Sequence, residues 1–237
     1  MVVVGPHGSP PRDPSSLIMP RPSAPSRAIQ SEYPDAAQRW ALVVYRDIGD
    51  VYVARSFDFT DDVEAFRSKL SAQFADGGGD YPEAPDAALA AMAQLDWREG
   101  EATSRLSFWV ADAPHHDDKA ADLAEALRDA RSLDVHIYPV ASSGVDEFTE
   151  LAMRSAAQFT GGRYVFLTND SGVGGAHKEP SIPCYFVTRL DQAILRMVSI
   201  ELSGTYSEPS ADEVIRRGGN PQSGSCQLES GDTVAVF

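Results

Sequence analysis

Short apolar runs alternate with longer amphipathic segments along most of the chain. The runs 40–47 (WALVVYRD), 105–112 (RLSFWVAD) and 134–141 (DVHIYPVA) are apolar and are bounded by polar residues. Such runs are typical of strands that are buried on both faces. A shorter run at 163–167 (RYVFL) has the same character. We therefore expect four buried strands, with core aromatic residues at Trp40, Phe108 and Trp109.

A different pattern follows the first of these strands. Residues 51–59 (VYVARSFDF) alternate apolar and polar side chains, and the turn residues Ile-Gly-Asp separate them from the run 40–47. Alternation with a period of two indicates a strand with one exposed face. We expect the two segments to form a hairpin whose second strand lies at an edge of the sheet.

The segments between the strands have the composition and spacing of amphipathic helices. Thr60 can cap the first of these helices, and Pro82 is tolerated in the first turn of the second. Strands that alternate with helices predict a doubly wound α/β fold, with a mainly parallel sheet covered by helices on both faces. The expected helices cover residues 60–73, 82–95, 118–132, 146–161 and 188–204.

Proline content marks a boundary near the start of the chain. Residues 1–26 hold seven of the sixteen prolines, and proline at that density disfavours helices and central strands. We expect a disordered leader over 1–26, one α/β domain over 27–204, and a C-terminal tail over 205–237.

Charge and cysteine content narrow the class of function. Acidic residues outnumber basic ones 35 to 20, for a net charge of −15, which disfavours binding to nucleic acid or anionic lipid and suits cations or basic partners. No apolar run approaches the roughly 20 residues of a membrane span, and the start of the sequence lacks a secretory signal, so a cytoplasmic protein is expected. Cys184 and Cys226 lack metal-site spacing, and their pairing is left open.

Carboxylates stand where strands are expected to end. Asp47 and Asp112 close two of the apolar runs, and Asp80 and Glu83 precede a helix after three glycines. Ligands of open parallel sheets bind beyond the carboxyl ends of the strands. Carboxylates about 4 Å apart repel by roughly 4 kcal/mol near a protein surface unless a cation or a proton neutralises them. Such oxygen ligands favour Mg²⁺, Ca²⁺ or Mn²⁺; the alternative is that the acids only stabilise the start of a helix.

The order of these segments resembles a von Willebrand factor type A (vWA) domain over 27–204, with acidic segments most similar to the inserted domain of integrin beta subunits. The D-x-P-E element of that group is matched by DYPE at residues 80–83, and its strand-terminal aspartate by Asp112. The resemblance implies that Glu83 and Asp112 serve the main metal ion-dependent adhesion site. It also implies an auxiliary cation site at Asp47, Asp80 and Pro82, with Glu83 shared.

One element of the vWA pattern is missing. Such domains open with a central strand that ends in D-x-S-x-S; the nearest string here supplies Asp13 and Ser15 but has Leu17 in place of the second serine. The sequence therefore predicts a domain without its central first strand, which would leave the flanking strands roughly 10 Å apart. Val2–Val4 could form a very short replacement strand, another chain could fill the gap, the flanking strands could close up, or the chain could fold poorly. A truncated reading frame would explain both the leader and the missing element.

The resemblance implies a non-enzymatic, divalent-cation-dependent protein-binding module of adhesion type. Its partner would present an acidic side chain, and the truncation would degrade its metal site, so that the cation is not necessarily bound in this chain. One alternative is a metal-dependent hydrolase using Glu83, Asp112 and His116. Another is a structural domain without a ligand. If a secretory leader has been lost, the expected location changes to the periplasm or the cell exterior.

Overall fold

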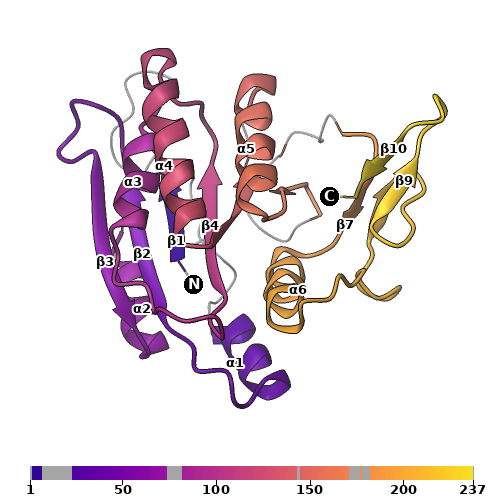
Figure 1. The fold of residues 1–237 in the computed structure, drawn as a ribbon, viewed down its shortest axis with the longest axis horizontal. Coiled ribbons are helices and arrows are strands. Elements are labelled where there is room, and N and C mark those ends of the chain that lie inside the picture. The colour runs from indigo at the N-terminus through magenta and orange to yellow at the C-terminus, as the bar shows by residue number, and fades with distance from the viewer. Residues whose placement is uncertain are drawn as a thin grey trace.

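The computed structural model describes residues 2–6, 23–73, 82–142, 145–170, 177 and 182–236. Six strands form one sheet in the order β3-β2-β1-β4-β5-β6 (Figure 1). Strand β3 is antiparallel to β2, and the other paired strands are parallel. The doubly wound α/β fold and the hairpin expected from the sequence are thereby confirmed. The strands are β1 (Val2–Pro6), β2 (Trp40–Tyr45), β3 (Ala54–Thr60), β4 (Arg105–Ala111), β5 (Val135–Ala141) and β6 (Val165–Phe166).

The central strand comes from the segment that was expected to be an irregular leader. Strand β1 pairs with β2 from Val2 opposite Ala41 to Pro6 opposite Tyr45, and its first three residues also pair with β4. The expectation of a missing central strand is therefore wrong, as is that of a leader without regular structure, whereas the alternative of a short replacement strand at Val2–Val4 is confirmed. The two flanking strands offer backbone donors and acceptors on both sides, and three consecutive valines favour the extended backbone that can use them.

Helices cover both faces of the sheet. On one face lie α3 (Pro85–Ala93), α4 (Ala120–Ser132) and α5 (Glu147–Thr160), and their buried side chains share one hydrophobic cluster. A short 3₁₀ helix, η2 (Asp117–Lys119), leads into α4. The second cluster, on the opposite face, contains buried residues of α1 (Ser23–Glu32), α2 (Val63–Ser71) and α6 (Leu190–Ser203).

The sequence of β2 is apolar without interruption because both faces of the strand are buried. Successive strand side chains point to opposite faces of a sheet, so alternate residues of β2 enter the two clusters. All six are buried, at about 1.5–3 kcal/mol for each large side chain. Trp40, Phe108 and Trp109 are buried as expected. The β2 residues on one face are Ala41, Val43 and Tyr45, and those on the other are Trp40, Leu42 and Val44.

Two helix starts differ from the sequence expectation by a few residues. Helix α2 is capped by Asp62, whose side chain accepts hydrogen bonds from the backbone N–H groups of Glu64 and Ala65 at 2.9 and 3.0 Å. Thr60 lies two residues too early and instead accepts from the N–H of Asp62. Helix α3 begins at Pro85, which occupies its first turn. Pro82 precedes the helix.

The segment 205–237, expected to be a tail, contains short strands. Strand β7 (Tyr185–Val187) pairs with β8 (Arg216–Gly218), and β9 (Ser225–Gln227) pairs with β10 (Thr233–Ala235), both antiparallel. A Cys184–Cys226 disulfide, with a Cα–Cα distance of 6.0 Å, ties β7 to β9. No helix in the described part of the chain has the length and apolar character that a membrane span requires.

Candidate functional site

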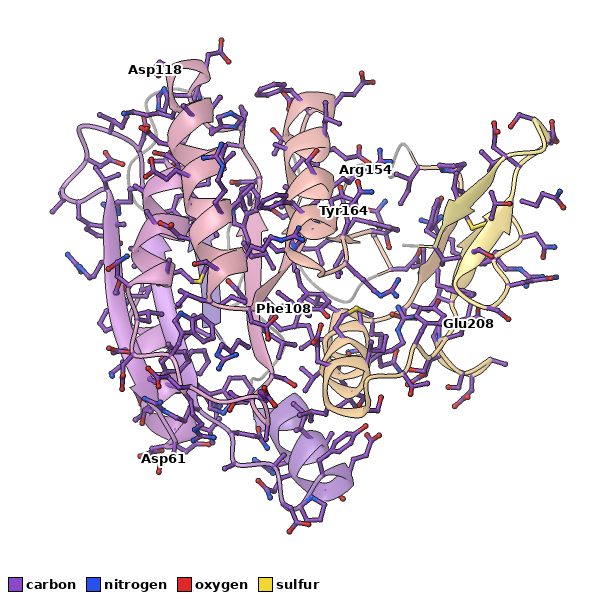
Figure 2. All side chains as sticks on the ribbon, in the orientation of Figure 1. Asp61, Phe108, Asp118, Arg154, Tyr164 and Glu208 are labelled. Atoms are coloured by element: carbon purple, nitrogen blue, oxygen red, sulfur yellow. A yellow bond between two sulfur atoms is a disulfide. The ribbon has the colours of Figure 1, made fainter. Side chains whose placement is uncertain are left out.

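Three acidic residues from separate segments lie at the carboxyl ends of the central strands. Asp47 follows β2 by two residues, Asp112 follows β4 directly, and Glu83 lies just before α3. We call these three residues the carboxylate rim. Asp47 and Asp112 lie at the edge of the sheet towards which the β4 arrow points in Figure 1, and Figure 2 labels Asp118 at the same end of the molecule. Strands β2 and β4 run parallel on either side of β1, so their ends meet at one edge.

Backbone contacts bring Glu83 to the end of β4. The N–H of Glu83 donates a hydrogen bond to the carbonyl of Pro114 at 2.9 Å, and Glu83 forms an isolated parallel bridge with His115. Glu83 is only 5% exposed. The segment before α3 is therefore fixed against the loop that carries Asp112.

Tyr45, at the end of β2, lies within the electrostatic influence of two of the rim carboxylates. Burial is the main cause that raises the pKa of this phenol, and the negative charges of Asp112 and Glu83 raise it further. The Tyr45 hydroxyl donates to the carbonyl of Val110 at 3.3 Å. Burial also raises the pKa of Asp112 itself. Asp112 and Glu83 thus converge on one buried phenol, in surroundings that disfavour negative charge.

The third rim residue has a partner that the sequence did not reveal. A ring nitrogen of His116 forms a short contact with a carboxylate oxygen of Asp47, which is 7% exposed. The neighbouring His115 ring stacks on Phe148 of α5, with ring centroids 5.2 Å apart, and burial lowers the pKa of His115. The two adjacent histidines thus have different surroundings.

A further buried acid belongs to the same region. Asp86, in the first turn of α3, is 7% exposed, and burial raises the pKa of its carboxyl group. Its charge acts on His115 of the neighbouring loop. Asp86 was not among the site residues expected from the sequence. Its position three residues after Glu83, on a helix rich in alanine and leucine, was the sequence feature that pointed to it.

The described residues supply only part of a cation shell. Pro82 is half-buried beside Glu83, whereas Asp80, Asp13 and Ser15 lie outside the described residues. Within the described ranges no group of three or more His, Cys, Asp or Glu side chains is arranged to hold a metal ion. Glu83 and Asp112 offer oxygen donors, but Mg²⁺ and Ca²⁺ take at least six oxygen ligands. The described donors alone therefore do not form a complete metal site.

Comparison with known proteins adds support for the fold. No protein-family model matches the sequence, and no curated protein matches it. The structure is similar to that of the conserved hypothetical protein BatB from Bacteroides thetaiotaomicron, with a TM-score of 0.52 at 13% identity, covering 86% of this chain and 98% of that one. The pilus adhesin SpaC from Lactobacillus rhamnosus GG matches with a TM-score of 0.49 at 8% identity, over 72% of this chain and 28% of the adhesin. At these identities the BatB likeness concerns the fold alone.

Proposed function

We propose that the protein is a non-enzymatic, adhesion-type protein-binding module of the vWA kind, and that its partner binds at the carboxylate rim. The resemblance of the DYPE element and Asp112 to the integrin beta pattern supports this proposal, as does a sheet whose first strand lies between the second and the fourth. The observation that carries it is the convergence of Glu83 and Asp112 on the buried Tyr45. A buried carboxylate, Glu83, and a half-buried one, Asp112, at one rim are costly unless a bound group compensates their charge.

We further propose that the group that compensates these charges is a divalent cation. Glu83 and Asp112 would hold a divalent cation, Mg²⁺ or else Ca²⁺ or Mn²⁺, and an acidic side chain of the partner would add a ligand. Because the D-x-S-x-S ligands are missing, binding should be weak. At the auxiliary site of Asp47, Asp80 and Pro82, the His116 imidazole already contacts Asp47. We expect any cation there to bind more weakly still.

Calorimetric titration with Mn²⁺ and Mg²⁺ tests the proposal. The double variant Glu83→Gln and Asp112→Asn should lose the binding seen in the wild type. The matched control is Asp117→Asn with Asp118→Asn, which removes the same number of charges from exposed residues of the same region and should bind as the wild type does. A short peptide with one glutamate, added at saturating Mn²⁺, should bind the wild type and the control only.

Two results would count against this function. Equal Mn²⁺ binding by the wild type and by the Glu83→Gln, Asp112→Asn variant would show that the cation does not bind at the rim. Metal-dependent hydrolysis of ester or phosphate-ester substrates, lost in His116→Ala, would instead identify a hydrolase.

The cellular location forms a separate part of the proposal. Disulfides persist in oxidising compartments and are rare in the cytosol, and Cys184 and Cys226 are bonded in this structure. We therefore propose a periplasmic or extracellular protein. Mass measurement of protein from its native source under non-reducing conditions should show both thiols resistant to alkylation; alkylation of both would favour the cytoplasm.

A further inference from the structure

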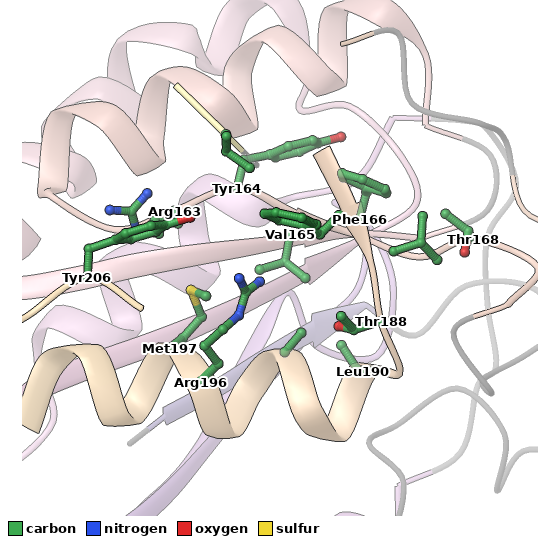
Figure 3. Close-up of a pocket in the computed structure, with 14 residues that line it drawn as sticks. Arg163, Tyr164, Val165, Phe166, Thr168, Thr188, Leu190, Arg196, Met197 and Tyr206 are labelled. Carbon is green, nitrogen blue, oxygen red and sulfur yellow. The ribbon is translucent and has the colours of Figure 1, made fainter. Parts of the chain in front are cut away.

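A second region, distant in sequence from the rim acids, has the chemistry of a ligand pocket. A cavity of about 590 Å³, counting the part open to solvent, lies between β6, β7, α6 and the C-terminal segment. Figure 3 shows Arg196 rising from α6 towards β6, and Arg163 beside the ring of Tyr206. The cavity shares no residue with the carboxylate rim, and the inference below does not depend on the proposed function.

Two arginines line this cavity, and neither pairs with an acid of the described residues. Neither Arg163 nor Arg196 forms an ion pair within the described part of the chain. The Nε of Arg196 is buried and makes no hydrogen bond to any described residue, and the same holds for the Tyr206 hydroxyl. The chain carries 35 acidic residues against 20 basic ones. A half-buried guanidinium that pairs with no described carboxylate is therefore unexpected here.

The surroundings of Arg196 disfavour its positive charge. Burial is the main cause that lowers the pKa of this guanidinium, and the positive charge of Arg163 lowers it further, whereas Tyr206, Glu213 and Glu208 act in the opposite direction without cancelling the burial. Arg163 lies over the Tyr206 ring at 4.6 Å from its centroid. A partly buried charge without a partner is costly, so an anion placed between the two half-buried arginines would relieve this cost.

The remaining walls of the cavity suit an apolar body. Phe166 from β6, Phe186 from β7, and Leu190 and Met197 from α6 line it. Pockets for small molecules are typically apolar with a few polar groups that fix orientation. Here the two arginines lie at one end with Tyr206, and Thr168 and Thr188 line the other end (Figure 3).

The wall that carries Tyr206 is held in place by the C-terminal segment. Gly224 has a φ of +79°, and a Cβ at this residue would come within 3.0 Å of the Tyr206 ring. The N–H of Gly224 donates to a carboxylate oxygen of Glu208 at 3.1 Å. The Cys184–Cys226 disulfide anchors the β7 wall to the same segment. The cavity is thus bounded by elements that are fixed to one another.

We propose that this cavity binds a carboxylate attached to an apolar body, with the carboxylate between Arg196 and Arg163. A guanidinium pairs with a planar carboxylate through two parallel hydrogen bonds. Glu208 and Glu213 also act on Arg196, and their negative field favours a single charge over a dianion such as phosphate. The carboxylate belongs either to a small free acid or to the C-terminus of a peptide.

Titrations with three probes test this pocket: benzoate, inorganic phosphate, and an acetylated peptide that ends in phenylalanine. Benzoate or the peptide should bind the wild type, and Arg196→Met should weaken that binding at least about tenfold. Tighter binding by the peptide would identify a chain terminus as the natural ligand, and tighter binding by benzoate a small acid. The control Arg128→Met removes an exposed arginine of α4 and should leave binding unchanged.

A thermal unfolding measurement separates a binding role from a structural one. Without ligand, Arg196→Met should unfold at the same temperature as the wild type or higher, because it removes a half-buried charge that pairs with no carboxylate of the described residues. If that variant folds poorly, Arg163→Gln provides the same comparison from a half-buried residue. Equal probe binding by the wild type and the arginine variants would overturn the proposal. Phosphate binding as tight as that of benzoate, or no binding by any probe, would also overturn it.

Discussion

Deletion of residues 1–6 removes β1 and should abolish the fold. The strand has five residues in register with β2 and three with β4, which gives eight paired positions in the middle of the sheet. At a net value of about 1 kcal/mol for each hydrogen bond, the loss is about 8 kcal/mol. This matches the whole stability of a typical domain, roughly 5–15 kcal/mol. This estimate counts only the backbone hydrogen bonds of β1.

Circular dichroism and urea unfolding of the deletion variant measure this effect. The variant alone should show no cooperative urea transition. Addition of a synthetic peptide of residues 1–8 should restore the cooperative transition. A peptide with Val3→Pro serves as the control, because proline removes a backbone donor, and it should restore less. A deletion variant that unfolds at the wild-type urea concentration would refute the central position of β1.

Three further results are expected. Asp62→Ala should lower the free energy of unfolding by about 1 kcal/mol, measured by urea titration, because the α2 cap is lost; no change would show that the cap is not formed. The pKa of His136 is raised, chiefly by its hydrogen bond to Glu201, so the stabilisation is present below about pH 6.5 and is lost as the pH rises through the higher folded-state pKa. Glu201→Gln should flatten this part of the melting-temperature profile, and an unchanged profile would contradict the pairing. Reduction of Cys184–Cys226 should cost about 4 kcal/mol in the chain-entropy estimate for residues 42 apart; equal melting temperatures with and without reductant would refute a stabilising bond.

The parts of the fold that follow from local patterns were predictable. Strand β2 is an uninterrupted apolar run because helices cover both of its faces, and each side of the strand meets a different cluster. The capping of α2 was misplaced by two residues, since Thr60 and Asp62 are both good caps and only the strand end decides between them. The ends of the apolar runs likewise predicted that Asp47 and Asp112 lie at one edge of the sheet, and the ends of β2 and β4 confirm it.

The parts that depend on distant segments were predictable only as one alternative among several, as for β1, or not at all. Strand β1 is a short run of valines in a proline-rich stretch, and it becomes a strand because β2 and β4 offer hydrogen bonds on both sides. Strands β8, β9 and β10 have three residues each, too few for a periodic signal. The contact between His116 and Asp47 depends on the path of the loop after β4, which no local pattern specifies.

Paramagnetic broadening by Mn²⁺ tests the carboxylate rim most directly. In a backbone NMR spectrum, substoichiometric Mn²⁺ should first broaden the amide signals of Glu83, Asp112 and Tyr45, because these residues surround the expected ion. The same signals should persist in the variant Glu83→Gln with Asp112→Asn. Broadening that begins at the exposed acids Asp117 and Asp118, or that spreads evenly over the surface, would contradict a cation site at the rim.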